Sequence, residues 1–192
     1  ALEIVEFIKE HSQTTCFHFE VKAETMSDEL IRALSEAKPG LFQLEIGVQS
    51  TNRDTLLKIK RGADFERITE VVCRLKENGN IHLHLDLIAG LPGESAEQFE
   101  QSFNDVFRLH PQNLQLGFLK KLKGARLDAS GSEFQDAPPY EVVRSDAMSY
   151  AELLHLKDME DVLEKYYNSG TFQNTLAYLI GTYAPNRPYN FF

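Results

Sequence analysis

The stretch HLHLDLIAGLPGES, residues 82–95, decides the fold of this chain of 192 residues. Polar side chains alternate with leucines up to Asp86, which is typical of a strand with one apolar and one polar face. A Gly-Leu-Pro-Gly turn follows, and Ser95 with Gln98 forms a capping box, the pattern that begins a helix. We therefore interpret the stretch as a strand, a tight turn and the start of a helix.

The same order of strand and helix is repeated along the first 122 residues. Strands are expected at 14–21, 41–50, 80–90 and 113–122. Helices are expected at 1–12, at 28–40 and from Thr51 onward, and then at 64–79 and 96–110. Ser27 is expected to cap the second of these helices, and Thr51 with Asp54 forms a capping-box-like start for the third. This alternation predicts an α/β fold, a partial TIM-like (βα) barrel with about four parallel strands joined by right-handed crossovers.

The remaining residues break this rhythm. A loop rich in glycine, proline and aspartate begins near residue 123, two helical stretches follow at about 149–167 and 171–181, and the last residues are expected to be extended. We therefore divide the chain into the carboxyl-terminal portion of a barrel, residues 1–122, and a loop and helical extension, residues 123–192.

Two features favour a truncation. The first helix begins without a capping residue, and four strands are too few for a closed barrel, which needs eight strands in roughly 250 residues. We expect the chain to be the carboxyl-terminal part of a larger protein. An open half-barrel leaves its edge strands exposed, which would allow a homo-oligomer.

Composition excludes several classes of protein. The net charge of −9 gives no basic surface for nucleic acid or for an anionic membrane, so neither is expected as a partner. No apolar run approaches the roughly 20 residues that a membrane span needs. The two cysteines, Cys16 and Cys73, are expected to be buried core thiols in a reduced, cytoplasmic protein.

Every predicted strand has one wholly apolar face, which we expect to pack against helices, and one polar face. Either the polar groups satisfy one another in the barrel interior, or the interior holds a polar ligand. Ligand sites of such folds lie at the carboxyl ends of the strands. Glu20, Gln49 and Asp86 are at those ends and are the candidate site residues, whereas Gln43, His82 and His84 are expected to fill the lower interior.

A metal site is the alternative for the two histidines. His82, His84 and Asp86 lie on one face and could supply three ligands, which would suit a metal-dependent hydrolase. They follow one another along the strand, however, about 6.6 Å apart at each step of two residues, rather than surrounding one point. We therefore expect no metal at these residues.

Three motifs carry a resemblance to a known family. EIGVQS (45–50), KIKRG (58–62) and DLIAGLPGES (86–95) resemble, in order and spacing, the radical S-adenosylmethionine (SAM) superfamily. The longer run from 17 to 120 is similar to a branch whose members carry a cobalamin-binding-type domain and are related to anaerobic magnesium-protoporphyrin ester cyclase. The resemblance implies a partial barrel that binds SAM at the carboxyl ends of its strands.

The resemblance also implies roles for single residues. Glu20 stands where the family places an acid that binds the cofactor, and Gln49 stands at a SAM contact. Arg61 is expected to meet the methionyl carboxylate, Asp86 to accept hydrogen bonds from the ribose hydroxyls, and Ile88 to pack on the adenine. No catalytic residue is assigned.

One departure concerns the iron–sulfur cluster. The Cys-x-x-x-Cys-x-x-Cys motif that holds a [4Fe–4S] cluster in the family is absent here, so the cluster would be bound by residues outside this chain. When intact, the protein is expected to act on an unknown small-molecule substrate, either by cleaving SAM to a 5′-deoxyadenosyl radical or in cobalamin-dependent methyl transfer or cyclisation. The fragment itself is expected to be inactive, and a non-catalytic binding or assembly domain on the same fold is the alternative.

Overall fold

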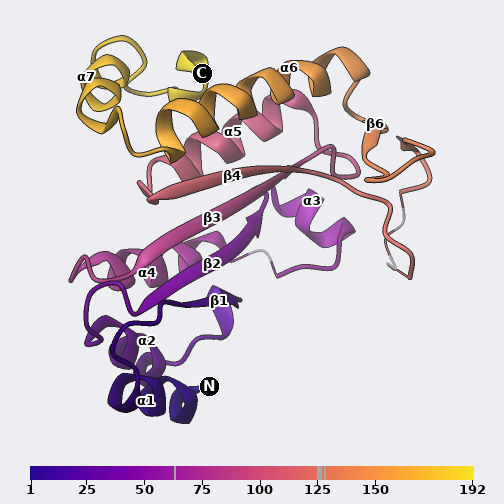
Figure 1. Ribbon diagram of the computed structural model, residues 1–192. Coiled ribbons are helices and arrows are strands. Elements are labelled where there is room, and N and C mark those ends of the chain that lie inside the picture. The colour runs from indigo at the N-terminus through magenta and orange to yellow at the C-terminus, as the bar shows by residue number, and fades with distance from the viewer. Residues whose placement is uncertain (63, 125–126, 128) are drawn as a thin grey trace.

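The computed structural model describes residues 1–62, 64–124, 127 and 129–192. The barrel-like part contains, in chain order, α1 (Leu2–His11), β1 (Phe17–Val21), η1 (Ala23–Thr25), α2 (Asp28–Ser35), β2 (Phe42–Gln49), α3 (Arg53–Lys58), α4 (Phe65–Lys76), β3 (His82–Ala89), α5 (Ala96–Phe107) and β4 (Asn113–Phe118). The four strands form one parallel sheet in the order β1-β2-β3-β4 (Figure 1). The prediction of an α/β fold with a partial barrel of four parallel strands is confirmed.

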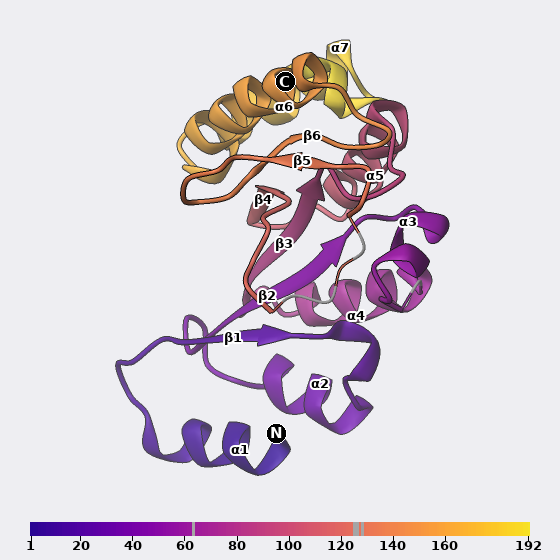
Figure 2. The same cartoon turned by 90° about the vertical axis from the view of Figure 1, so that its right-hand side faces the viewer.

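The remaining elements follow β4. They are β5 (Glu133–Phe134), β6 (Val142–Arg144), α6 (Tyr150–Val162), η2 (Leu163–Asn168), α7 (Gln173–Tyr183) and η3 (Pro188–Phe191). β5 and β6 form a short antiparallel hairpin, and β6 contacts α6 (Figure 2). The helical carboxyl-terminal part is therefore confirmed, whereas the hairpin was not expected from the sequence.

The alternation of side chains sorts the sheet into two faces. The apolar positions of β2, β3 and β4 are buried against α2, α4 and α5, and Leu44, Leu83, Leu85 and Leu87 are fully inaccessible to solvent. The polar positions on the opposite face are half-buried or exposed, except Gln49 at the end of β2, which is buried. Burial of the apolar face is the main stabilising contribution, at about 25 cal/mol for each Å² removed from water.

Helix starts follow the expected capping chemistry at two of three positions. Ser27 accepts a hydrogen bond from the backbone N–H of Leu30 at the start of α2, and Ser95 with Gln98 forms the capping box of α5. The third prediction is wrong by one residue, since the side chain of Asn52 rather than Thr51 caps α3. Thr51 instead turns its hydroxyl toward Asp105 in α5, 3.1 Å away.

Other expectations fail. Cys16 and Cys73 are exposed rather than buried. Cys16 lies in the segment before β1, and Cys73 lies on the face of α4 opposite the buried Ile68, Val72 and Leu75. The tail is not extended, since Pro188–Phe191 forms a short helical turn. Strand β4 ends at Phe118 instead of 122, because the chain leaves the sheet there to form a bridge between Lys120 and Glu141.

No helix among the described residues is long and apolar enough to cross a membrane.

Candidate functional site

A cavity of about 410 Å³ lies at the carboxyl ends of β1, β2 and β3, on the polar face of the sheet. Four of the five candidate residues line it, and each comes from a different segment. Glu20, Gln49 and Asp86 belong to β1, β2 and β3, and Arg61 belongs to the loop after α3. Its size is within the range of roughly 300–1,000 Å³ that small-molecule sites occupy. The sheet therefore brings these four side chains together at the edge where α/β folds bind ligands.

Asp86 is a half-buried acid of this cavity. Its neighbour across the sheet is Gly47, which has no side chain to cover the carboxylate. One carboxylate oxygen, Oδ1, is buried and has no hydrogen-bond partner among the described residues. Burial raises the pKa of Asp86 to about 7, with further contributions from the charge and hydrogen bond of Glu45 and the charge of Glu20, which outweigh the opposing charge of Arg61.

Arg61 and Gln49 are held by the end of β2. The Arg61 guanidinium donates a hydrogen bond to the Gly47 carbonyl oxygen, 3.0 Å away, which leaves its other N–H groups for the cavity. The register between β2 and β3 shifts between Gly47 and Gln49, and Gln49 has a φ of 70°, the left-handed region that few residues other than glycine adopt. The Gln49 amide nitrogen is 2.3 Å from where a Cβ on Gly47 would lie, so glycine makes room for it.

The lower part of the polar face largely satisfies itself. The Gln43 amide donates to His84 Nε2 at 2.8 Å, and His18 Nε2 lies 3.1 Å from a Glu45 carboxylate oxygen. Burial lowers the pKa of His84, so this ring accepts the hydrogen bond in its neutral form. The two alternatives for the polar face therefore apply at different depths, with paired groups below and an unpaired carboxylate oxygen above.

His82 does not lie in the interior as expected. It is exposed at the first position of β3, and its ring centroid is 4.8 Å from that of His84. In the described part of the chain, no group of three or more histidine, cysteine, aspartate or glutamate side chains is arranged to hold a metal ion. The geometry therefore gives no support to a metal-dependent hydrolase at these histidines.

Ile88 is the candidate that the cavity does not include. Ile88 lies two residues after Asp86 in β3, on the same face of the sheet. It is half-buried and pairs with Gly117 of β4. Its side chain is not among the residues that line the cavity.

Three charged lining residues were not singled out from the sequence. Glu45 lies on the polar face, below Asp86. It could have been predicted there, because Gln43, Glu45 and Gly47 occupy alternate positions of β2. Lys22 and Lys60 come from loops, where no alternation indicates direction. With them the cavity presents three carboxylates and three cationic groups, a mixed set that suits a zwitterionic ligand.

The fold and this cavity together define a barrel-type protein with a cavity of ligand size at the carboxyl ends of its strands. The model of the radical SAM superfamily matches residues 1–106, more than half of the chain, and the chain belongs to this superfamily. A second model, described as a protein of unknown function (DUF4080), matches residues 129–192.

Individual relatives agree with this assignment. A tRNA-2-methylthio-N(6)-dimethylallyladenosine synthase of Clostridium botulinum is 26% identical over 173 residues, which cover 86% of this chain and 38% of that protein. The coproporphyrinogen III oxidase HemN of Escherichia coli has the same fold with a TM-score of 0.57 and 20% identity, over 85% of this chain and 36% of that one. The methyltransferase TsrM of Kitasatospora setae was solved with cobalamin and a [4Fe–4S] cluster. It gives a TM-score of 0.58 and 15% identity, over 79% of this chain and 34% of that one. The chain thus spans little more than a third of the length of these relatives.

Membership of the superfamily implies SAM and a [4Fe–4S] cluster. The residues that line the cavity fit SAM. SAM carries an ammonium, a sulfonium, a carboxylate and ribose hydroxyls, and the cavity offers carboxylates beside a guanidinium. The unpartnered Asp86 Oδ1 is an acceptor that a ribose hydroxyl would satisfy.

The cluster does not fit this chain's own residues. A [4Fe–4S] cluster of this family needs three thiolates from one short motif. The chain has two cysteines, Cys16 and Cys73, which lie far apart in the sequence and are both exposed. No step of chemistry is therefore assigned to a cluster here.

Proposed function

We propose that this chain forms the SAM-binding cavity of a radical SAM enzyme whose substrate is a small molecule. The observation that carries the proposal is the buried, unpartnered carboxylate oxygen of Asp86 inside a cavity that also holds Arg61, Gln49 and Glu20. A buried polar atom without a partner costs free energy, and a ligand hydroxyl removes that cost.

Each residue has a separate task in the proposal. Asp86 accepts hydrogen bonds from the ribose hydroxyls, and Arg61 holds the methionyl carboxylate with the N–H groups that Gly47 leaves free. Glu20 faces the ammonium group, Gln49 donates or accepts through its amide, and Ile88 packs on the adenine. When bound, SAM would supply a methyl group, or a 5′-deoxyadenosyl radical after one-electron reduction by a cluster held outside this chain, and the residues of this chain would bind and orient it.

A narrower form of the proposal places the protein in the branch that uses cobalamin for methyl transfer or cyclisation. Its support is the likeness of the motifs at 45–50 and 86–95 to members that carry a cobalamin-binding-type domain. The cluster, and cobalamin where it is used, would be held by parts of the protein outside these residues. Anaerobically purified full-length protein that contains neither iron nor acid-labile sulfide would favour the alternative, a non-catalytic binding or assembly domain.

The test is SAM affinity, measured by isothermal titration calorimetry on the full-length protein. Asp86→Asn keeps the shape of the side chain but loses the charged acceptor, so we expect the dissociation constant for SAM to rise roughly tenfold or more. Arg61→Lys keeps the charge but not the planar fork, and a similar loss is expected.

Asp161→Asn is the matched control, because Asp161 is exposed on α6 and pairs only with Lys165 among the described residues. It removes the same charge without touching the cavity and should leave the affinity unchanged. Wild-type affinity in both the Asp86 and the Arg61 variants would overturn the assignment of this cavity to SAM.

A further inference from the structure

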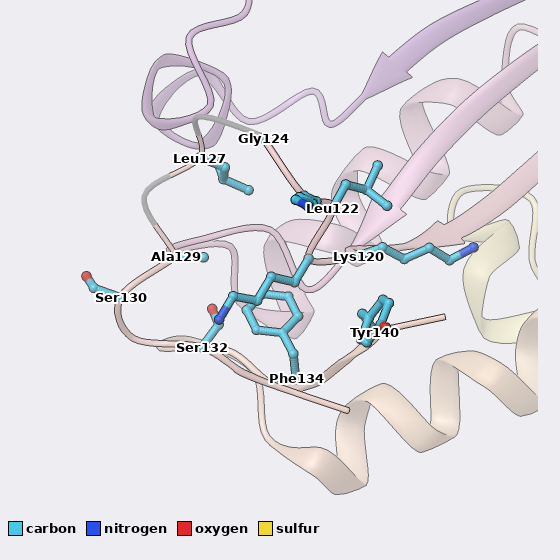
Figure 3. Close-up of a pocket in the computed structure, with 11 residues that line it drawn as sticks. Lys120, Leu122, Gly124, Leu127, Ala129, Ser130, Ser132, Phe134 and Tyr140 are labelled. Atoms are coloured by element: carbon cyan, nitrogen blue, oxygen red, sulfur yellow. The ribbon is translucent and has the colours of Figure 1, made fainter. Parts of the chain in front are cut away.

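A second and larger cavity, of about 820 Å³, opens where the chain continues beyond β4. The segment after β4 and the β5–β6 hairpin line it, with Lys121 and Lys123 among the lining residues. Leu127, Ser132, Phe134 and Tyr140 also line it (Figure 3). None of these residues lines the SAM cavity, and nothing above gives them a role. Its size suits a small organic molecule.

The charge of this cavity is opposite to that of the protein. The chain has a net charge of −9, yet the described lining residues include three lysines and no carboxylate. Lys120 directs its side chain away from Phe134 and Leu127 (Figure 3), which leaves Lys121 and Lys123 as the cations of the cavity. Neither has an ion pair within the described ranges, so both charges are available to an anion.

The rest of the lining is apolar and aromatic. The Lys121 ammonium lies 5.9 Å from the centre of the Phe134 ring, so a cation stands over an aromatic face. Leu127 and Tyr140 add further apolar surface. Such a lining favours a ligand that carries a ring or another apolar body beside its anionic group.

Ser132 provides an independent sign of a ligand. Its hydroxyl oxygen is buried and has no hydrogen-bond partner in the part of the chain that the structure describes. Buried hydroxyls are normally paired, and the Ser132 hydroxyl lies in the lining of this cavity, where a ligand oxygen could pair with it.

The position of the cavity links it to the SAM cavity. The larger cavity lies beyond the carboxyl end of β4 and the SAM cavity at the carboxyl ends of β1, β2 and β3, so both lie at the same edge of one parallel sheet. The hairpin that lines the larger cavity also touches the Gly-Leu-Pro-Gly turn, since Asp146 accepts a hydrogen bond from the Gly93 N–H at 2.7 Å. A Cβ on Gly90 would lie 2.7 Å from Val142 of β6, so the hairpin is seated directly on this turn.

We propose that the Lys121–Lys123 cavity binds the substrate, an organic anion with a carboxylate or phosphate group on a ring-bearing body. The inference rests on the proposed function and deepens it, because a substrate in this cavity would lie at the same edge of the sheet as SAM. Lys121 and Lys123 bind the anionic group, Phe134 and Leu127 contact the ring, and Ser132 donates to or accepts from a polar substituent.

The experiment uses naphthoate and naphthyl phosphate as probes, with naphthalenemethanol as the neutral ring and inorganic phosphate as the anion without a ring. Their binding to the full-length protein is followed by fluorescence and calorimetry. Both anionic rings, or one of them, should bind more tightly than the neutral ring and than phosphate. The double variant K121Q/K123Q should weaken this binding roughly tenfold or more.

Lys165→Gln is the matched control, since Lys165 is exposed and pairs with Asp161 far from the cavity. Phe134→Leu tests the ring contact and should weaken naphthoate without weakening phosphate. Thermal melting of each variant shows whether the fold is kept. Equal affinity for naphthalenemethanol or for phosphate, or unchanged naphthoate binding in K121Q/K123Q, would overturn the proposal.

The two proposals fail separately. Asp86→Asn should weaken SAM without weakening naphthoate, and K121Q/K123Q should do the reverse. Loss of naphthoate binding in Asp86→Asn alone would place the anion in the SAM cavity and overturn the second site. Absence of SAM binding in every variant would overturn the proposed function while leaving the anion site to be judged by its own probes.

Discussion

Asp86 is held in an environment that opposes its ionisation. Burial and two neighbouring carboxylates raise its pKa to about 7, and one oxygen lacks a partner in the described structure. An acid at this position costs stability in the absence of a ligand. Perturbed acids in a cavity are typical of functional sites, because the interaction that the fold does not supply is left for the ligand.

This cost makes stability depend on pH. In the unfolded chain Asp86 ionises near its ordinary pKa of 3.8, while in the folded protein it keeps its proton up to about pH 7. Between these values the unfolded state binds fewer protons, so the contribution of Asp86 to the free energy of unfolding falls as the pH rises. Asp86→Asn cannot ionise and should be more stable than the wild type above pH 7, by roughly 1–2 kcal/mol after allowance for partial exposure.

Urea unfolding at about pH 4 and about pH 8 measures the effect. We expect the advantage of Asp86→Asn to be present at the higher pH and to be much smaller at the lower one, where the wild-type carboxyl is protonated in the folded state and only partly ionised in the unfolded one. Asp161→Asn, which changes an exposed carboxylate, serves as the reference for the general effect of charge. A constant difference between wild type and Asp86→Asn at both pH values would contradict the raised pKa.

The ends of three elements meet at a second buried acid, Glu94. It follows the Gly-Leu-Pro-Gly turn, is fully buried, and accepts hydrogen bonds from Ser50 after β2 and from Ser102 in α5. Ser102 also accepts from the backbone N–H of Thr51 at 3.0 Å. Glu94 thereby fixes the loop after β3 to the end of β2, next to the residues that line the SAM cavity.

Truncation of Glu94 should loosen this junction. Glu94→Ala leaves the hydroxyls of Ser50 and Ser102 buried without their acceptor, and we expect the free energy of unfolding to fall by about 2–3 kcal/mol. Burial raises the pKa of Glu94 to about 7, so Glu94→Gln mimics the protonated side chain and should stay within about 1 kcal/mol of the wild type near pH 6.

Chemical unfolding of both variants checks this, with Glu10→Ala as the control because Glu10 is exposed on α1. A Glu94→Ala protein as stable as the control would show that the junction does not depend on the carboxylate. Equal losses in Glu94→Ala and Glu94→Gln would instead mean that the charge itself is required.

The strands could be predicted because their side chains alternate. Leu83, Leu85 and Leu87 point to the helices, and the opposite parity places Asp86 with Gln49 and Glu20 on one face, so part of the candidate site followed from counting. Helix caps were predictable where one serine had one partner. The sequence pattern cannot predict the hydrogen-bond partner of Thr51. Its hydroxyl could have capped α3, but in the structure it donates to Asp105 in α5.

Loops and helix surfaces gave less information. Lys22 and Lys60 reach the cavity from loops, and no spacing rule indicates where a loop side chain lies. Cys73 was expected in the core because its neighbours are apolar, yet a helix turns about 100° at each residue and places it opposite the buried face. The β5–β6 hairpin is too short for a periodic signal.

The carboxyl-terminal part and the sheet form one molecule rather than two loosely joined pieces. Leu153, Leu156, Met159 and Leu163 belong to the same buried cluster as the strands. The free edge of β4 is paired by Asn168 of η2, whose side chain accepts from the Leu114 N–H and donates to the Leu114 carbonyl, each at 3.0 Å. The expected exposure of this edge strand is therefore wrong at Leu114, because a side-chain amide takes the place of a fifth strand.

This arrangement predicts a single cooperative unfolding transition. All seven tyrosines lie between residues 140 and 189 and the chain has no tryptophan, so tyrosine fluorescence reports on the carboxyl-terminal part alone. Far-UV circular dichroism reports on the helices of both parts. The two signals should give the same Tm, because the shared core cannot be exposed on one side only.

Asn168→Ala tests the edge contact within the same experiment. It leaves the N–H and C=O of Leu114 without these partners, at a cost of about 2 kcal/mol, and should lower the Tm by roughly 4–8 °C in both signals together. Asn168→Asp keeps an acceptor for the Leu114 N–H but sets a carboxylate against the Leu114 carbonyl and Glu164, so it should lose at least as much. If tyrosine fluorescence changed at a lower temperature than circular dichroism, the carboxyl-terminal part would unfold first. The hairpin that lines the Lys121–Lys123 cavity would then be able to detach while the SAM cavity stays folded, contrary to the seating of Val142 and Asp146 on the Gly-Leu-Pro-Gly turn.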